Sequence, residues 1–295
     1  MNLSSTILGK NTLLTQLQNF SEEYILEVEN TFKMGIENPE IKLETISELS
    51  IQQEIDSQTI KNTITLNQIK GRTESHIMQP FLEQSLALAE ISKTLDLKRS
   101  PKGTLIGIID KENLWHDWRQ WKINRLKNVF PEEKEQIKFV KNYEKGIENF
   151  DEGLKDNLQY ILMLPEIYEV VFPPNQQYNY LFSPKKFKSR LINEAVYQYQ
   201  MKLVKLEEVK NELEVVLHAQ LSNKDYIIEK YLNNIYKSTP DFTISDYSFS
   251  MIINYKLEKS TGKIIEANLV LVEKLHENLS YSIKMNLNKR TLFDN

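Results

Sequence analysis

The sequence predicts an α+β fold built on a curved antiparallel sheet of about 8–10 strands, in two strand sets, packed on or wrapped around a central helical segment. Segments in which every second residue is apolar lie towards both ends of the chain. Segments with helical apolar spacing lie between them. A sheet with one apolar face must cover that face, and the intervening helices are the available cover.

The N-terminal part predicts strands around residues 20–32, 41–51 and 60–66, where apolar residues share one parity. Residues 75–93 have the spacing of an amphipathic helix. Residues 97–110 predict a hairpin that turns at a Pro-Lys-Gly sequence. This half of the sheet therefore ends in a helix and a hairpin.

Two helical segments follow, at residues 112–130 and 131–163. Pro131 suits the first turn of a helix, and acidic residues come directly after it. Gly146 and Gly153 predict a kink or a break in the second segment. These helices are expected to seal the apolar face of the sheet.

The C-terminal part contains the clearest strands. Apolar residues alternate in 195–203 and 213–221, and in a meander formed by 247–257, 265–271 and 279–287, listed in chain order. A turn at 207–212 joins the first two strands, and the glycine-bearing 259–263 joins two strands of the meander. Residues 224–237 have helical spacing instead.

The expected domain organisation is one co-folded unit with two parts. Residues 1–172 hold the N-terminal strands, the hairpin and the helices, and residues 191–295 hold the C-terminal meander. Three of the nine prolines fall within residues 173–190, which we interpret as a linker.

Composition excludes several classes of function. The chain has 295 residues, a net charge of −4 and no cysteine, so disulfides, thiolate metal sites and a cysteine nucleophile are excluded. The acidic balance predicts no nucleic-acid partner. No apolar run reaches the length of about 18 residues that a membrane helix needs, and the first residues do not read as a signal peptide. We expect a cytoplasmic protein, and its lysine-, isoleucine- and asparagine-rich composition favours a bacterial source.

The three tryptophans lie within seven residues of one predicted helix. On a helical wheel they share an arc with aliphatic and aromatic neighbours, which indicates a buried helix face. The alternative is an interaction surface in which basic side chains border the aromatic arc. Its candidate residues are Trp115, Trp118, Arg119, Trp121, Lys122 and Arg125.

A short basic segment surrounds Phe187. Its candidate residues are Lys185, Lys186, Lys188 and Arg190. Such a pattern can bind single-stranded nucleic acid, but the run is short and the protein is acidic. We therefore expect a solvated loop.

Motifs that carry catalysis are missing from the sequence: it has no glycine-rich phosphate loop, no nucleophile elbow and no pair of histidines at metal-ligand spacing. We therefore predict no catalytic residue, metal ligand or cofactor. The sequence favours a non-enzymatic binding or interaction protein, such as an adaptor, an assembly factor, an immunity-type protein or an accessory of a larger machine, with a protein partner.

A carrier of an apolar ligand in a half-barrel-like cavity is the alternative, and an enzyme of unidentified class is the third hypothesis. The carrier hypothesis rests on aromatic and methionine side chains on inward strand faces, because methionine adapts to varied apolar surfaces. The candidate lining residues are Tyr199, Met201, Phe249, Met251, Tyr281 and Met285.

Overall fold

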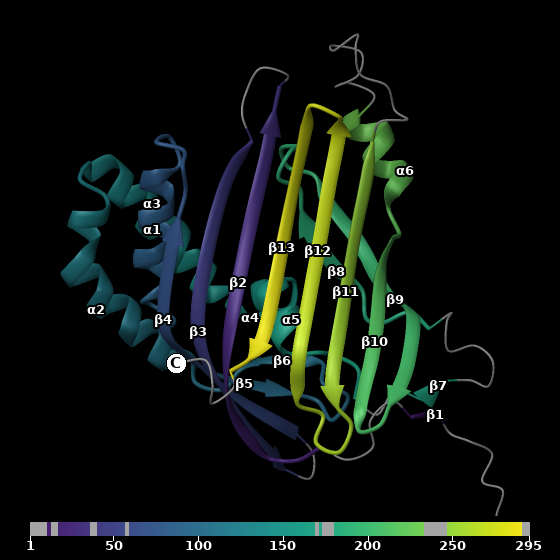
Figure 1. The fold of residues 1–295 in the computed structure, drawn as a ribbon. Coiled ribbons are helices and arrows are strands. Elements are labelled where there is room, and N and C mark those ends of the chain that lie inside the picture. Colours follow the sequence, from purple (N-terminus) through teal and green to yellow (C-terminus); the bar gives the residue numbers. More distant parts are fainter. Residues whose placement is uncertain are drawn as a thin grey trace, which may run out of the picture.

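A computed structural model describes residues 11–12, 17–35, 40–56, 59–168, 171–172, 180–232 and 247–290. Within these ranges, eleven strands form one open antiparallel sheet (Figure 1). Its strand order is β6 (Leu105–Ile108), β5 (Thr94–Arg99), β4 (Thr59–Arg72), β3 (Ile41–Asp56), β2 (Phe20–Met34), β13 (Leu279–Lys289), β12 (Ile264–His276), β11 (Ser248–Glu258), β10 (Glu212–Leu221), β9 (Val196–Val209) and β8 (Lys185–Lys188). The strands β1 (Asn11–Thr12) and β7 (Val171–Phe172) form a separate pair.

Six α-helices accompany the sheet in the described ranges. They are α1 (Gln79–Ala89), α2 (Lys111–Val129), α3 (Glu133–Glu148), α4 (Phe150–Lys155), α5 (Leu158–Met163) and α6 (Lys224–Ile227). A π-helical turn over Ile228–Leu232 extends α6, while the end of the helix predicted for 224–237 lies outside the described residues. The predicted α+β class and curved antiparallel sheet are confirmed, with eleven strands in the sheet.

The two predicted strand sets join into one continuous sheet. Strand β2, early in the chain, pairs antiparallel with β13, the last strand, and Val28 lies opposite Met285. Inward and outward residues alternate along these strands, as in β13, where Tyr281, Ile283 and Met285 are buried. One face of the sheet is therefore apolar along its length and requires a cover.

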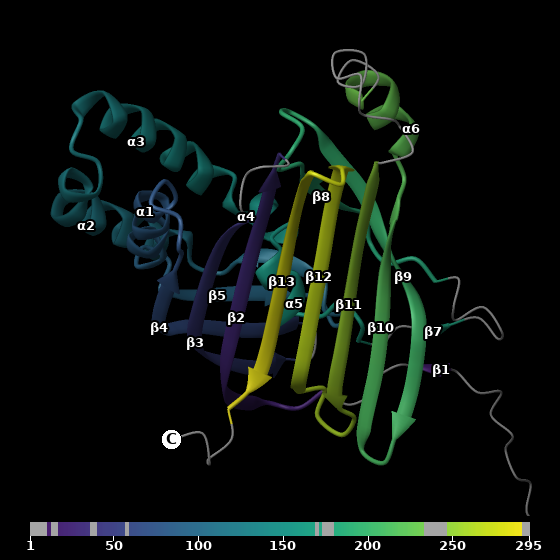
Figure 2. The ribbon, with the colours of Figure 1, turned by 45° about the horizontal axis from the view of Figure 1, so that its top comes forward.

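The apolar face is concave, and short helices lie in its hollow. Figures 1 and 2 show α4 and α5 behind the central strands, with the strands of both sheet edges turned towards the same side. Helix α5 packs on β12 and β13, and α4 packs on β6. The hydroxyl of Tyr255 on β11 donates a hydrogen bond to the carbonyl oxygen of Ile161, at 2.7 Å, which ties α5 to the sheet.

The helices that cover the sheet are only in part the ones expected from the sequence, because α4 and α5 come from the predicted segment 131–163 but the tryptophan helix does not cover the concave face (Figure 1). We predicted that the tryptophan helix and its neighbour would seal it. Instead, α1, α2 and α3 form a lobe beside β3 and β4 (Figures 1 and 2) with a hydrophobic core of its own. The aromatic side chains of α2 and α3 pack against one another, as described below. Their apolar surface is therefore buried without contact with the concave face of the sheet.

The expected break in the long helical segment occurs at asparagines rather than at glycines. Gly146 and Gly153 lie inside α3 and α4. Helix α3 ends at Asn149, whose side chain donates to the carbonyl oxygen of Lys145 at 2.9 Å. Asn157 begins α5 by accepting a hydrogen bond from the backbone N–H of Gln159. Asparagine side chains compete with helical hydrogen bonds, which explains breaks at these positions.

Turn chemistry sets the strand ends. The predicted turn over 207–212 shrinks to Lys210 and Asn211, because β9 and β10 continue into it. Lys210 adopts the left-handed φ of 59° that such a tight turn requires. The hairpin predicted over 97–110 is confirmed as β5 and β6, with Gly103 at a φ of 89°.

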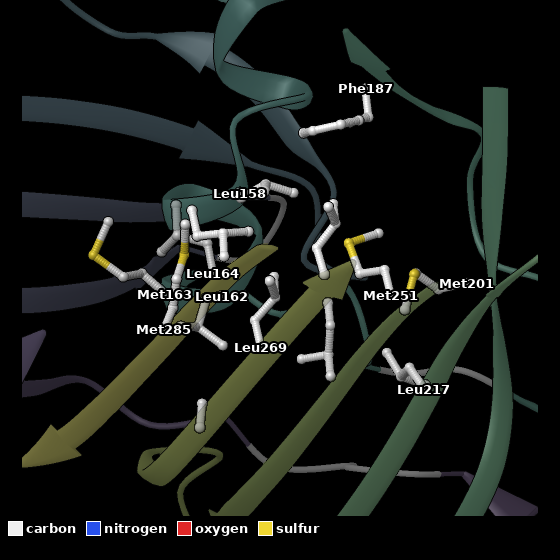
Figure 3. Packing of buried hydrophobic residues seen from close by; sticks show 14 of the residues in the cluster. Leu158, Leu162, Met163, Leu164, Phe187, Met201, Leu217, Met251, Leu269 and Met285 are labelled. Carbon is white, nitrogen blue, oxygen red and sulfur yellow. The ribbon is translucent and has the colours of Figure 1, made fainter. Parts of the chain in front are cut away.

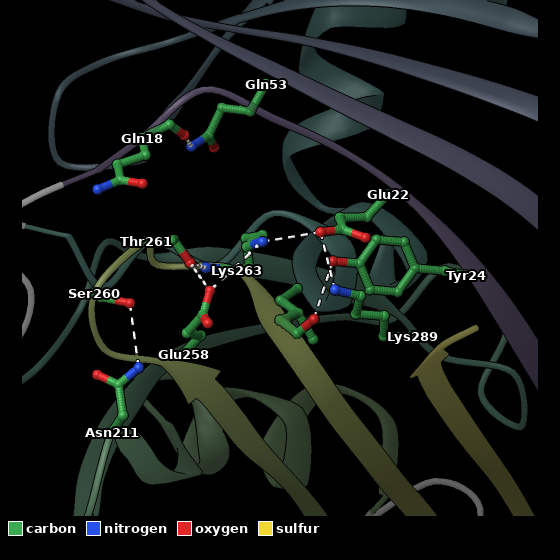
Figure 4. Close-up of polar contacts among 11 residues, drawn as sticks. Gln18, Glu22, Tyr24, Gln53, Asn211, Glu258, Ser260, Thr261, Lys263 and Lys289 are labelled. Carbon is green, nitrogen blue, oxygen red and sulfur yellow. Dashed lines mark hydrogen bonds and ion pairs between the residues drawn. The ribbon is translucent and has the colours of Figure 1, made fainter. Parts of the chain in front are cut away.

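A polar network fixes the end of the sheet where β2, β12 and β13 meet (Figure 4). The Glu22 carboxylate forms ion pairs with the ammonium groups of Lys263 and Lys289, and each nitrogen lies 2.9 Å from the carboxylate oxygen. Burial opposes ionisation of Glu22, but the two ammonium groups outweigh it and hold the pKa of this carboxyl below its usual range. The Tyr24 hydroxyl donates to the carbonyl oxygen of Ile264 at 3.0 Å.

Among the described helices, none is long and apolar enough to cross a membrane.

Candidate functional site

The centre of the concave face is a filled hydrophobic core. In Figure 3, side chains of α5 and the residue after it, Leu162, Met163 and Leu164, lie over Met285 and Leu269 of the sheet. All five are 5% exposed or less. Close packing of this kind leaves little room for a ligand under the middle of the sheet.

The residues that we predicted to line a cavity lie in this filled part. Tyr199, Met201, Met251, Tyr281 and Met285 are buried and Phe249 is half-buried. A cavity beside Met201 measures about 30 Å³, the volume of about one water molecule. The structure therefore brings these side chains together as core, and their role in binding a ligand stays a prediction.

A larger cavity lies under the other half of the sheet, between strands β2 to β5 and the helices α3 to α5. Its volume is about 420 Å³, within the range of roughly 300–1,000 Å³ that small-molecule sites occupy. The sheet side is formed by Leu26, Ser47, Leu49, Ile64, Leu66, Ile69 and Leu95. The helix side includes Gly146, Phe150, Gly153, Leu154, Tyr160 and Met163. We call this the β2–β5 cavity.

The β2–β5 cavity exists because two hydrophobic cores meet here without merging. The main core holds the concave face with α4 and α5, and the second core holds the α1–α3 lobe. Phe150 and Ile108 pack against both cores. Phe150 also lines the cavity, so the space lies at the junction between the two cores.

Two glycines keep the helix side of the cavity open. Gly146 on α3 and Gly153 on α4 line it, and a Cβ atom at either position would have no heavy atom within 4 Å. Glycine costs stability inside a helix relative to alanine. Both glycines are exposed to solvent, so the cavity opens to water along this helix side.

Polar groups enter the β2–β5 cavity from two connections. Ser92 and Lys93 lie between α1 and β5, and Asn157 and Gln159 lie at the start of α5. Lys93 is the one charged residue among the described residues that line the cavity. The site thus combines apolar side chains with polar groups, and both kinds contribute to its accessible surface.

Sequence reasoning missed this site. The two glycines carried a signal, because glycine inside a helical pattern costs stability relative to alanine. We interpreted them as a kink instead. Lys93 carried a weaker signal. It lies two residues before Leu95 and four before Leu97, so in an extended strand its side chain points to the same buried face as theirs.

The tryptophans lie in the second core. Trp118 and Trp121 are 0% and 5% exposed, and Trp115 is half-buried. Trp118 and Trp121 stack with ring centroids 5.7 Å apart, and the Tyr143 ring lies 4.5 Å from Trp118. The indole of Trp121 donates to the carbonyl oxygen of Ala87 at 2.9 Å. These contacts agree with the interpretation as a buried helix face.

The basic residues of the same helix have different surroundings. Lys122 contacts Glu144 at 2.8 Å, and Glu144 also accepts from the indole of Trp118 at 3.0 Å. The hydrogen bond from Lys122 and then that from Trp118 hold the pKa of Glu144 below its usual range. Arg119 and Arg125 are exposed, and Arg125 pairs with Glu90 at 3.5 Å. The interaction-surface hypothesis stays a prediction and now rests on the exposed part of this helix.

The basic segment around Phe187 is not the solvated loop that we expected. Residues 185–188 form the edge strand β8, in which Lys185 and Phe187 point inward and Lys186 and Lys188 outward. Inward and outward residues alternate along this segment, which is the pattern of an edge strand with one buried face. The Lys185 ammonium is buried against Glu166 at 2.7 Å, so the four basic groups, Arg190 included, do not form one exposed patch.

Other buried polar groups brace the fold rather than form a second cavity. Glu273 is fully buried on β12 and accepts hydrogen bonds from the hydroxyls of Ser189 and Tyr197 and from the backbone N–H of Arg190. These bonds fasten the turn after β8 to the sheet. No group of three or more His, Asp or Glu side chains that could hold a metal ion occurs in the described ranges.

Neither a protein-family model nor a curated protein matches the sequence. Among solved structures, lipovitellin, in a structure concerned with its lipid–protein interactions, aligns over 94% of this chain with a TM-score of 0.47 and 12% identity. The chain spans 25% of the lipovitellin chain. DynF from the dynemicin biosynthesis pathway of Micromonospora chersina aligns over 94% of this chain and 83% of its own, with a TM-score of 0.22 and 5% identity.

A putative outer membrane lipoprotein-sorting protein domain from Vibrio parahaemolyticus aligns over 92% of this chain and 87% of its own. Its TM-score is 0.19 and its identity is 9%. At these TM-scores the similarities carry no argument about function. The site must therefore be interpreted from its own geometry.

Proposed function

We propose that the protein binds an apolar small molecule in the β2–β5 cavity. The observation that carries this proposal is the open space of about 420 Å³ between the apolar face of strands β2 to β5 and the helices. Burying an alkyl or ring system there gains about 25 cal/mol per Å² of apolar surface removed from water. A space at the junction of two cores can be filled without disrupting either core.

Much of the cavity is formed by side chains that are buried in the protein core. Leu49, Ile64 and Leu95 on its floor are 5% exposed or less. Leu154 and Met163 on its roof are equally buried. Binding to such a preformed surface requires little ordering of the protein, which lowers the cost of association.

Plugging the cavity tests the proposal. Gly146→Leu and Gly153→Leu, alone and combined, place a side chain where a Cβ has free space. Binding of the neutral apolar probe N-phenylnaphthylamine, followed by fluorescence, is expected to weaken on the order of tenfold in the double variant. Gly153→Ala is expected to retain binding, because one methyl group leaves most of the space open.

Asn142→Leu is the matched control, because this exposed position lies on α3 outside the cavity lining. It adds the same side chain and is expected to leave probe binding unchanged. Native mass spectrometry of the protein from its source adds a second readout, a co-purified apolar molecule that the double variant lacks. Equal probe affinity in the wild-type protein and the double leucine variant, or a wild-type protein that binds no probe, would overturn the proposal.

A protein-interaction surface is the second candidate function. Exposed apolar side chains in and next to the α1–α3 lobe favour it: Ile123 on α2 is 77% exposed, and Ile77 in the turn before α1 is 76% exposed. A contiguous exposed apolar patch commonly marks a contact with a partner, whereas single exposed apolar residues are common on any protein surface. A partner bound at fixed stoichiometry should be lost from Ile123→Glu and kept by Ile106→Glu, an equivalent change at an exposed position on β6. Equal behaviour of the two variants would contradict this candidate.

A further inference from the structure

We infer that the ligand of the β2–β5 cavity is an amphiphile with an anionic head group, such as a carboxylate, and that Lys93 binds this head. The inference rests on the proposed function and specifies its ligand. Three observations carry it: the shape of the cavity floor, the position of Lys93 at one end of that floor, and the charge of the lining.

Apart from Ser47, the floor of the cavity is an apolar track across four neighbouring strands. Leu26 on β2 lies opposite Ser47 on β3, Leu49 on β3 lies opposite Leu66 on β4, and Ile64 on β4 lies opposite Leu95 on β5. Three strand spacings amount to roughly 14 Å. An elongated chain of methylene groups fits such a track better than a compact polar molecule does.

Lys93 stands at the β5 end of this track. The backbone N–H of Leu66 donates to the carbonyl oxygen of Lys93 at 2.7 Å, which extends the β4–β5 pairing by one residue. In β5 the odd-numbered residues Leu95 and Leu97 are buried on the concave face. Lys93 continues their parity and lines the cavity, while the residue itself remains exposed to solvent.

The lining gives a binding site for one negative charge. Lys93 supplies the one formal charge among the lining residues that the structure describes, and no carboxylate accompanies it there. The ion pairs found between described residues do not include Lys93. Next to it, the hydroxyl of Ser92 can donate a further hydrogen bond to an anion. A head group at this end would keep its charge near water while its chain follows the apolar track.

The test compares three ligands that share an alkyl chain: dodecanoate, dodecanol and dodecyltrimethylammonium. Displacement of N-phenylnaphthylamine gives their relative affinities. Wild-type protein is expected to bind dodecanoate on the order of five- to tenfold more tightly than dodecanol, and the cation most weakly. Lys93→Met is expected to remove the preference for dodecanoate over dodecanol, whereas Lys93→Arg retains the preference.

Lys98→Met is the matched control, because Lys98 is exposed on the same strand with the opposite parity. It removes the same charge from the protein outside the cavity lining and is expected to keep the preference for dodecanoate. Equal binding of dodecanoate and dodecanol, or equal effects of Lys93→Met and Lys98→Met, would overturn the inference and leave the proposed function standing. Binding of none of the three ligands would overturn the proposed function itself.

Discussion

The guanidinium of Arg99 donates a hydrogen bond to the carbonyl oxygen of Pro165 at 2.6 Å and so fastens the chain after α5 to strand β5. Arg99 is 1% exposed. It also donates to the carbonyl oxygen of Gly103 at 2.8 Å and to the side-chain oxygen of Asn62 at 3.1 Å. The guanidinium lies 5.1 Å from the centre of the Tyr168 ring. One side chain thus holds a hairpin, a neighbouring strand and the covering segment together.

Arg99→Met is expected to lower the free energy of unfolding by about 3 kcal/mol, because three buried acceptors lose their donor. Arg99→Lys should recover little of this loss, since an ammonium group does not match the fork of donors that a guanidinium presents. Urea unfolding followed by circular dichroism measures both effects. Lys98→Met, at the exposed neighbour, should stay within about 0.5 kcal/mol of wild type, and a similar loss there would contradict this role of Arg99.

Two glycines should respond oppositely to alanine. Gly103 has a φ of 89°, and a Cβ atom there would lie 2.7 Å from the carbonyl oxygen of Pro165, so Gly103→Ala is expected to cost about 2 kcal/mol. Gly146 lies inside α3 with free space around a Cβ, so Gly146→Ala should gain about 0.5–1 kcal/mol. Thermal unfolding of the two variants gives the sign of each change. A stabilising Gly103→Ala would show that the hairpin tolerates a different turn.

Much of the sheet could be predicted from the sequence because one-sided burial appears directly as alternation. The pattern over 247–257 predicted β11, where Met251, Ile253 and Tyr255 are buried. Alternation indicates which face a residue occupies but not which strand lies beside it. The pairing of β2 with β13 was therefore not predictable, although it joins the two strand sets.

The candidate site could be predicted far less well, for a related reason. The helical wheel identified Trp118 and Trp121 as buried, but not that their partners would be the aromatic residues of α3, such as Phe139. The β2–β5 cavity results from the failure of two cores to merge, which is a property of the tertiary packing. Residues such as Lys93 acquire their place in the cavity only through that packing.

Stability of the α1–α3 lobe should depend on the ionisation of Glu144. Its pKa is lower in the folded protein than the ordinary value of 4.5 because the carboxylate accepts hydrogen bonds from Lys122 and Trp118. A lowered folded-state pKa means that the stabilisation is present above about pH 4.5 and is lost as the pH falls through the folded-state value. Because both partners are about one-third exposed, the effect should remain below about 1 kcal/mol.

Tryptophan fluorescence reports this transition, since all three tryptophans lie on α2. In wild-type protein, the urea midpoint measured by fluorescence should decrease as the pH falls below about 4.5. Glu144→Gln should have a lower midpoint at pH 7 and a smaller decrease on acidification. Glu135→Gln, at an exposed position on the same helix, serves as the control and should keep the wild-type pH dependence. The same pH dependence in Glu144→Gln and in wild type would contradict the assignment.

The buried ion pair between Lys185 and Glu166 should be strongly coupled. The two side chains are 10% and 13% exposed and 2.7 Å apart, and the ammonium also donates to the carbonyl oxygen of Lys155 at 3.3 Å. Lys185→Met leaves the Glu166 carboxylate buried without its cation, so it is expected to cost about 3 kcal/mol of unfolding free energy. The double variant Lys185→Met with Glu166→Leu removes both charges and should recover a large part of that loss, because buried charges carry a desolvation cost that apolar side chains do not. A double-mutant cycle in urea measures the coupling.

Lys186→Met is the control for this prediction. Lys186 faces outward on the same strand, so the substitution should change the unfolding free energy by less than about 0.5 kcal/mol. Strictly additive losses in the cycle would show that the pair contributes no coupling to the attachment of β8.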